Sequence, residues 1–124
     1  MGALRLTVLL EPLPGARSAL DDLIHRLIAR SRGDGPGTLV YCYYAHPKSD
    51  RMFVHEHYAD AEAFLAHLTN VADLATKLGG CARVVRVEAA GSFSEQIRTM
   101  LSGNFDEAAL AAGACLFYDE FVEA

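Results

Sequence analysis

The stretch VHEHYADAEAF, residues 54–64, decides how the middle of the chain folds. Its first five residues are typical of a strand, in which successive side chains point to opposite faces of a sheet. Glu56 and Tyr58 therefore share one face, and His55 and His57 share the other. We predict that Glu56 and Tyr58 face the interior and that the two histidines face away, towards a subunit interface.

The second half of this stretch opens a helix. Asp60 is a residue type that caps helix N-termini, because its carboxylate can accept hydrogen bonds from the first free backbone N–H groups. The apolar residues that follow recur at helical spacing and form one stripe: Phe64, Leu68, Val71, Ala75 and Leu78. We therefore predict a strand that leads directly into a helix packed over it.

The flanking sequence supplies the other elements of an α+β fold. A helix with an apolar stripe at Leu20, Leu23, Ile24, Leu27 and Ile28 ends at the Gly-Asp-Gly-Pro-Gly run, and strands are predicted at 4–11, 38–46, 52–58 and 81–90. This order is βαββαβ, the ferredoxin-like unit, with a four-stranded antiparallel sheet and both helices on one face. Because the other face also carries apolar residues, we expect a second copy to cover it in a homodimer.

Residues 92–124 extend this core. They predict one or two short helices followed by a terminal strand over ACLFYDEFVEA, 114–124, lying on the sheet edge or on the partner subunit. We predict a single domain over 1–124, with a ferredoxin-like core at 3–91 and a C-terminal extension.

Composition excludes several classes of function. A formal net charge of −5 at pH 7 and scattered basic residues argue against a nucleic-acid-binding surface. No apolar run approaches the roughly 18 residues of a membrane-spanning helix, and the N-terminus lacks the marks of a signal peptide. The cysteines, Cys42, Cys81 and Cys115, are widely spaced, which predicts reduced thiols in a cytoplasmic protein with no membrane partner.

Two long stretches resemble the antibiotic biosynthesis monooxygenase family of dimeric α/β-barrel proteins. The first is PLPGARSALDDLIHRLIARSR, in which a Pro-Gly turn leads into a helix. The second is GPGTLVYCYYAHPKSDRMFVHEHYADAEAFLAHL, a hairpin followed by strand, Glu, aromatic residue, Asp cap and helix with an inward histidine. The resemblance spans roughly residues 4–90. It implies a homodimer with sheets packed face to face and a ligand cleft between sheet and helices in each subunit.

The resemblance also implies an activity: oxygenation of quinol-like or anthrone-like aromatics without a metal or a flavin. Other relatives degrade haem, and many have no known activity, so fold kinship alone does not fix the reaction. The family's site residues carry over to Glu56, Tyr58 and His67. Lys77 stands where the haem-degrading branch has an axial histidine, which argues against haem binding.

The residues themselves suggest how such a site would work. A helix that folds back over its preceding strand brings His67 towards Glu56 and Tyr58. A histidine held by a carboxylate can remove a phenolic proton, and Tyr58 can hydrogen-bond the substrate oxygen. The simpler alternative is that Glu56 and His67 satisfy each other under the helix.

Three further residues complete the predicted site. Tyr41 and Tyr43, on the neighbouring strand, are expected to line a substrate pocket. Asn70, one helical turn after His67, is a further candidate for substrate binding.

A metal site was the main competing interpretation of the histidines. His55 and His57, followed by Glu62, match the spacing of a cupin-type ligand set. Glu62 falls inside the predicted helix, and the second histidine motif of such sites is missing, so we predict no metal. The leading function is a cofactor-independent monooxygenase acting on a small hydroxylated aromatic or quinol. The alternatives are a non-catalytic dimeric protein that binds a small ligand, and an isomerase or lyase on the same fold.

Overall fold

The computed structural model describes residues 2–119 and 121–122. Its elements are β1 (Leu4–Pro12), α1 (Arg17–Ser31), β2 (Thr38–Ala45), β3 (Met52–Tyr58), α2 (Ala61–Ala75), a single 3₁₀ turn η1 (Leu78–Gly80), β4 (Ala82–Ala90), α3 (Glu95–Ser102), α4 (Glu107–Ala111) and β5 (Cys115–Tyr118). The predicted α+β fold and its βαββαβ order are confirmed.

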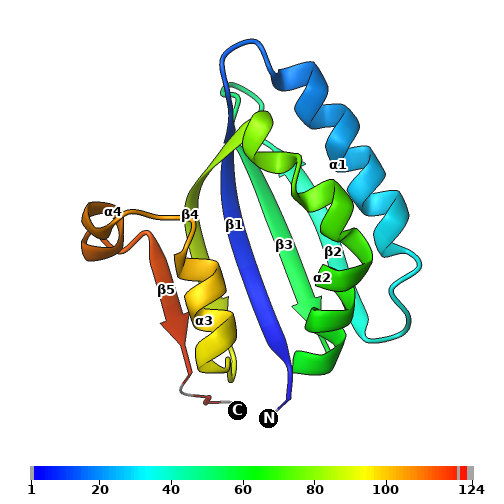
Figure 1. Cartoon of the computed structure of the whole chain (residues 1–124), viewed down its shortest axis with the longest axis vertical. Helices are drawn as coiled ribbons and strands as arrows, with labels where there is room; N and C mark the ends of the chain where they lie inside the picture. Colours follow the sequence, from blue (N-terminus) through cyan, green and yellow to red (C-terminus); the bar gives the residue numbers. More distant parts are fainter. Residues whose placement is uncertain (1, 120, 123–124) are drawn as a thin grey trace.

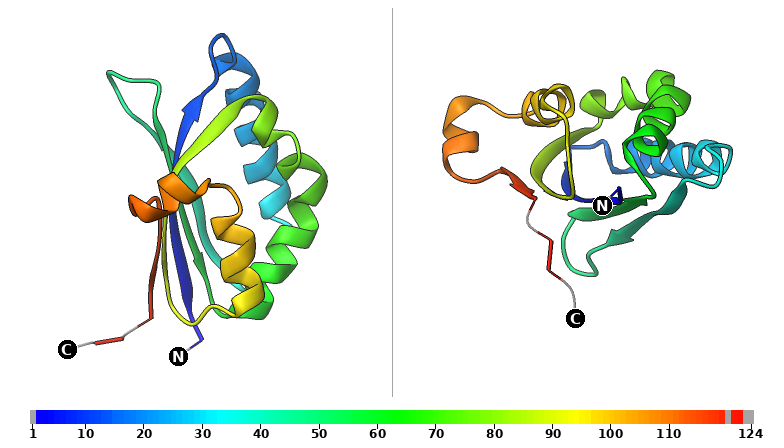
Figure 2. Two further views of the ribbon diagram at one scale, coloured as in Figure 1. Left: turned by 60° about the vertical axis from the view of Figure 1, so that its left-hand side comes forward. Right: turned by 90° about the horizontal axis from the view of Figure 1, so that it is seen from below.

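The five strands form one sheet in the order β2-β3-β1-β4-β5 (Figure 1). The first four strands are antiparallel, and β5 lies parallel to β4 at the edge. Figure 2 shows α1, α2 and α3 on the same side of the sheet, as expected for the ferredoxin-like arrangement.

The interior lies between this sheet face and the helices. One cluster of buried residues joins α1 to the sheet, through Leu20, Leu23, Ile24, Leu27, Leu10 and Val54. A second cluster joins α2 and α3 to the other end of the sheet, through Tyr58, Phe64, Leu4, Leu6, Phe93 and Ile97. Burial of this apolar surface is the main force that holds the helices on the sheet.

The junction between β3 and α2 fixes where α2 lies. The Asp60 side chain accepts a hydrogen bond from the Ala63 backbone N–H at 2.8 Å, which confirms the predicted N-cap. The loop before β2 passes very close to the same turn: a Cβ atom added to Gly37 would lie 2.5 Å from the Ala63 side chain. Only glycine allows this approach, and it presses the loop that follows α1 against α2.

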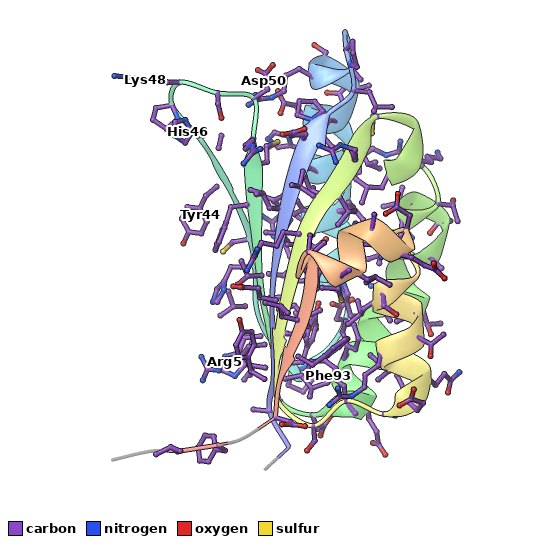
Figure 3. All side chains as sticks on the ribbon, turned by 90° about the vertical axis from the view of Figure 1, so that its left-hand side faces the viewer. Arg5, Tyr44, His46, Lys48, Asp50 and Phe93 are labelled. Carbon is purple, nitrogen blue, oxygen red and sulfur yellow. The ribbon has the colours of Figure 1, made fainter. Side chains whose placement is uncertain are left out.

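The opposite face of the sheet carries no helix among the described residues. Tyr44, 60% exposed, and Phe53, 37% exposed, contact each other there edge to face at a ring-centroid distance of 5.9 Å. Figure 3 shows Arg5 and Tyr44 projecting from this side, while Phe93 lies on the side of the helices. The face is therefore a mixture of large apolar and charged side chains open to solvent.

The C-terminal extension contains two short helices, α3 and α4, where one or two were predicted. Its strand is shorter than predicted, because pairing with β4 ends at Tyr118. Asp119, Phe121 and Val122 lie outside any strand, and positions 120 and 123–124 of the predicted strand lie outside the described residues. Across 2–119 and 121–122, none of the helices combines the length and the hydropathy required for a bilayer span.

Candidate active site

His67 lies on α2 and faces the sheet, where its residue surface is only 2% exposed. Its imidazole ring packs between two tyrosine rings. The ring centroid of Tyr41 lies 4.6 Å away and that of Tyr58 lies 5.3 Å away. The structure therefore brings three of the predicted site residues together under the helix.

The closest polar partner of His67 is Asp34, a residue of the loop between α1 and β2. The distance between His67 Nδ1 and Asp34 Oδ2 is 2.7 Å, and the two side chains are 3% and 1% exposed. Ser31, in the last turn of α1, places its Oγ 3.5 Å from the same ring nitrogen. A buried imidazole is thus paired with a buried carboxylate.

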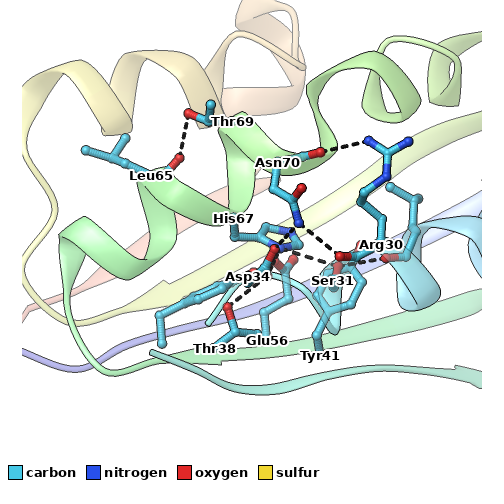
Figure 4. A network of polar contacts seen from close by, with 12 residues as sticks. Arg30, Ser31, Asp34, Thr38, Tyr41, Glu56, Leu65, His67, Thr69 and Asn70 are labelled. Carbon is cyan, nitrogen blue, oxygen red and sulfur yellow. Dashed lines mark hydrogen bonds and ion pairs between the residues drawn. The ribbon is translucent and has the colours of Figure 1, made fainter. Parts of the chain in front are cut away.

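Asp34 is itself held by two further donors (Figure 4). Thr38 Oγ1 donates to Asp34 Oδ2 at 2.9 Å, and Asn70 Nδ2 donates to Asp34 Oδ1 at 2.7 Å. Asn70 Nδ2 also donates to the Arg30 carbonyl at 2.9 Å, and the Arg30 guanidinium donates to the Asn70 carbonyl at 2.9 Å. This reciprocal pair ties α1 to α2 beside the carboxylate.

These contacts set the charge of Asp34. Burial alone raises the pKa of a carboxyl group, because it removes water from the charged form. Here the hydrogen bonds from Asn70, His67 and Thr38 outweigh that effect and hold the pKa of Asp34 below its usual value of 3.8. Asp34 is therefore an anion at neutral pH.

Glu56 has the opposite character. Its side chain accepts a hydrogen bond from the Tyr58 hydroxyl at 2.6 Å. Burial raises the pKa of Glu56, and the Tyr58 hydrogen bond and the charge of His67 offset this only in part. Among the described residues Glu56 makes no hydrogen bond to His67, so the simple Glu56–His67 pair is not what the structure contains.

The two tyrosines of β2 complete the polar group. The hydroxyls of Tyr41 and Tyr43 lie 2.8 Å apart, and Tyr41 is paired across the sheet with Glu56. Burial raises the pKa of both phenols, so both remain neutral hydroxyls. The site thus holds one carboxylate, one carboxyl group with a raised pKa, one imidazole and three phenols within a single interior layer.

Sequence comparison identifies the family. The profile described as "Antibiotic biosynthesis monooxygenase" matches residues 4–76, which is more than half of the chain. The chain belongs to the antibiotic biosynthesis monooxygenase family. The matched region contains every residue of the site just described, from Arg30 to Asn70.

Solved structures support the fold of this family member. MupZ from Pseudomonas fluorescens is 22% identical with a TM-score of 0.72, and the match covers 100% of this chain and 94% of that one. SnoaB from Streptomyces nogalater, described as a cofactor-independent oxygenase, is 14% identical with a TM-score of 0.63 and coverage of 76% and 96%. Rv0793 from Mycobacterium tuberculosis is 21% identical with a TM-score of 0.62 and coverage of 75% and 97%. No match was found among curated proteins.

The three residues of the cupin-like spacing, His55, His57 and Glu62, lie apart in this antibiotic biosynthesis monooxygenase family member. His55 and His57 lie on the helix-free face, whereas Glu62 is exposed on α2. Burial lowers the pKa of His57, and the nearby charges of Arg5, its cross-strand neighbour, and of His55 lower it further. Within the described part of the chain, no group of three or more His, Cys, Asp or Glu side chains is arranged to hold a metal ion.

Sequence reasoning missed Asp34, Ser31 and Thr38. Asp34 was assigned only to the glycine-rich run that ends α1, because an Asp between two glycines is typical of a loop. No local signal connects it with His67, 33 positions further along the chain. Asn70 lies beside Asp34 and directs both of its amide protons to the Arg30 carbonyl and to Asp34, so its role in substrate binding stays a prediction.

We expect Tyr58→Phe to lower the free energy of unfolding by about 1–3 kcal/mol, because it leaves the buried Glu56 carboxyl without its donor. Chemical denaturation at pH 7 measures this difference. Thr69→Val is the control for loss of a hydroxyl, since Thr69 is exposed on α2 and its hydroxyl donates to the Leu65 carbonyl at 3.0 Å, and it should change stability by less than about 0.5 kcal/mol. Equal effects of the two substitutions would show that the Tyr58–Glu56 bond adds little stability.

Proposed function

We propose that the protein is a cofactor-independent monooxygenase that oxidises a small hydroxylated aromatic or quinol with O₂. The observation that carries this proposal is His67, an imidazole held by Asp34 and flanked by Tyr41 and Tyr58 inside the sheet–helix layer of an antibiotic biosynthesis monooxygenase fold. The solved relative SnoaB is described as a cofactor-independent oxygenase, which supports this class of reaction.

The chemistry begins with removal of a proton. His67 takes the proton of a phenol or enol, so that an O–H bond breaks and an N–H bond forms. The resulting anion is electron-rich enough to give electrons to O₂ and to form a carbon–oxygen bond. Where the reacting carbon is a CH₂ group, loss of water from the hydroperoxide leaves a carbonyl. One oxygen atom of O₂ then enters the product and the other leaves as water, and the substrate supplies all the electrons.

The other site residues have supporting roles in this proposal. Glu56, whose pKa is raised by burial, can in its protonated form donate a hydrogen bond to the oxygen of the substrate as charge develops there, and the Tyr58 hydroxyl, which donates its proton to Glu56, holds that side chain in place. Tyr41 and Tyr43 present aromatic rings and neutral hydroxyls for substrate binding. The side-chain oxygen of Asn70, Oδ1, is offered to the substrate, while its amide protons bind Asp34 and the Arg30 carbonyl.

Burial of the site favours one alternative. Tyr58 is 0% exposed, His67 2% and Glu56 9%, so a substrate would require side chains to move before it reached the base. A non-catalytic dimeric protein that binds a small ligand elsewhere would show the same closed interior. An isomerase or lyase would use the same base without consuming O₂.

Oxygen uptake distinguishes these functions. We would treat the protein with a chelator, verify that it contains no flavin, and offer it a panel of quinols and anthrones at an oxygen electrode. The proposal predicts uptake above the uncatalysed rate with at least one compound, and a product that contains new oxygen. Binding without uptake would support the ligand-binding protein, and conversion without uptake would support an isomerase or lyase.

We also propose that the protein is a homodimer whose subunits pack through the helix-free faces of their sheets. The support is the pair Tyr44 and Phe53, large side chains that lie open on that face, and the dimeric α/β-barrel arrangement of the family.

The sheet shared by β1 to β5 supports treating 1–124 as one domain. The described cysteines are free thiols, which supports a cytoplasmic location.

Light scattering tests the dimer. At micromolar concentration we expect a mass of twice 13.4 kDa. Tyr44→Arg places a charge on the helix-free face and should shift the protein towards the monomer. Leu65→Arg, at a position that is 47% exposed on the outer side of α2, is the matched control and should leave the mass unchanged. A monomeric mass for the unaltered protein would contradict the proposal.

A further inference from the structure

We infer that Asp34 is a positioning residue, which holds His67 in the tautomer that carries its proton on Nδ1 and leaves Nε2 free to accept a proton from the substrate. This inference rests on the proposed function for its role in a reaction. It does not depend on that function for the tautomer itself, which follows from an account of hydrogen-bond donors and acceptors around the ring.

Asp34 accepts hydrogen bonds on both oxygens of its carboxylate. Thr38 Oγ1 and Asn70 Nδ2 both point hydrogen-bond donors at its carboxylate, at 2.9 and 2.7 Å. A carboxylate that receives donors on both oxygens is stabilised as the anion and can only accept. The third contact, at 2.7 Å from His67 Nδ1, must therefore be a bond that Nδ1–H donates.

Ser31 is the other polar group near Nδ1. Its hydroxyl donates to the Leu27 carbonyl at 2.7 Å. Its only proton is thus already used, and its oxygen, 3.5 Å from Nδ1, can act towards the ring as an acceptor alone. Both neighbours of Nδ1 are acceptors, so the proton of the neutral ring lies on Nδ1.

Nε2 is the remaining nitrogen of the His67 ring. It makes no hydrogen bond to any residue in 2–119 or 121–122. In the Nδ1–H tautomer it carries a lone pair, and the rings of Tyr41 and Tyr58 flank the imidazole. It is the one basic atom of the ring that can receive a proton from a bound phenol.

Several contacts hold Asp34 rigidly in place. Asp34 is fixed from three directions: by Thr38 at the start of β2, by Asn70 on α2, and by its own backbone N–H, which donates to the Ser31 carbonyl at 3.0 Å. A carboxylate fixed in this way fixes the plane of the imidazole that it binds. In serine proteases, an aspartate in the same relation to a catalytic histidine sets its tautomer, and replacing it by Asn lowers kcat by about 10⁴-fold.

The test combines a spectroscopic and a kinetic measurement. In uniformly ¹⁵N-labelled protein at pH 8, the ring nitrogen shifts of His67, assigned by comparison with His67→Gln, report which nitrogen carries the proton. We expect Nδ1–H in the unaltered protein. We expect Asp34→Asn to populate the Nε2–H tautomer, because the Asn amide can donate to Nδ1. With a substrate that the unaltered protein oxidises, kcat should fall by about 10²- to 10⁴-fold while KM changes by less than about threefold.

Asp73→Asn is the matched control. Asp73 lies on α2, the helix of His67, and pairs with Arg30 at 2.7 Å. Its side chain is 65% exposed and it does not touch His67. It should change neither the tautomer nor kcat.

The outcomes separate the inference from the proposed function. An Nε2–H tautomer in the unaltered protein would overturn the inference, and so would an Asp34→Asn variant with unchanged tautomer and kcat. If no compound is oxidised but the Nδ1–H tautomer is found and is lost in Asp34→Asn, the proposed function fails while the role of Asp34 in positioning His67 stands. Where Asp34→Asn does not fold, the spectrum of the unaltered protein still decides the tautomer.

Discussion

Replacing His67 by Gln should lower kcat for oxidation of a phenolic or quinol substrate by about 10²- to 10⁴-fold, the usual contribution of a positioned general base. Gln is chosen because its side-chain amide can still donate to Asp34, so the carboxylate is not left unpaired. It cannot take a proton at neutral pH. The loss should therefore lie in kcat, with the folded structure retained, as measured by oxygen uptake and by the unfolding transition of the same sample.

His25→Gln is the matched control for this substitution. His25 is exposed on the outer side of α1, where its Nδ1 lies 2.7 Å from the Asp21 carbonyl. It should leave kcat unchanged. If His67→Gln keeps full activity, another group removes the proton and the assignment of the base is wrong.

Replacing Asp34 by Ala should lower the free energy of unfolding by about 3–5 kcal/mol, because it removes a buried charged acceptor that is shared by three donors. The substitution leaves Thr38 Oγ1–H, one amide proton of Asn70 and His67 Nδ1–H without an acceptor in a site where the Asp34 side chain was 1% exposed. Each unpaired buried donor then costs the desolvation energy that the carboxylate had offset. Chemical denaturation measures the difference.

Asp73→Ala is the matched control, because it removes an exposed carboxylate of α2 instead of the buried carboxylate of Asp34. Its ion pair with Arg30 is exposed, so it should cost no more than about 1 kcal/mol. Similar costs for the two substitutions would contradict the account of the buried network.

The difference in free energy of unfolding between the unaltered protein and Asp34→Ala should also depend on pH. The pKa of Asp34 is lowered in the folded protein, so the stability that the carboxylate contributes is present above its unfolded pKa and is lost as the pH falls through the folded value. The gap between the unaltered protein and Asp34→Ala should therefore narrow below about pH 4. Glu56, whose pKa is raised, has the opposite sign, but it is present in both proteins and cancels from the difference.

The fold could be predicted from local pattern because each element is consistent with its own sequence. The alternation in β3 predicted that Glu56 and Tyr58 face inwards, and burial along the strand follows that alternation. The Asp60 cap and the helical spacing after it predicted α2, including the inward position of His67. These signals depend only on neighbours within a few positions of each other.

The pairing inside the site could not be predicted in the same way. Glu56 and Asp34 are both carboxylates within reach of an interior histidine, and spacing along β3 favoured Glu56. The structure pairs His67 with Asp34 because Gly37 lets the loop after α1 close onto α2, a contact between distant parts of the chain. Glu56 instead accepts a hydrogen bond from the hydroxyl of Tyr58, its neighbour on the same face of the strand.

The C-terminal extension shows the limit of strand propensity. The apolar and aromatic residues of 114–124 favour a strand throughout, but a strand lasts only as far as its partner, and β4 ends at Ala90, opposite Tyr118. Coverage of the whole chain by the MupZ match indicates that this extension occurs in another member of the fold.

The most direct test of the central claim is the fate of the two atoms of ¹⁸O₂ during turnover by metal-free and flavin-free protein. The account predicts one ¹⁸O atom in the organic product and the other in water, with this labelling lost in step with activity in His67→Gln. Hydrogen peroxide as the only reduced oxygen species, with no ¹⁸O in the product, would contradict it, because the protein would then be an oxidase.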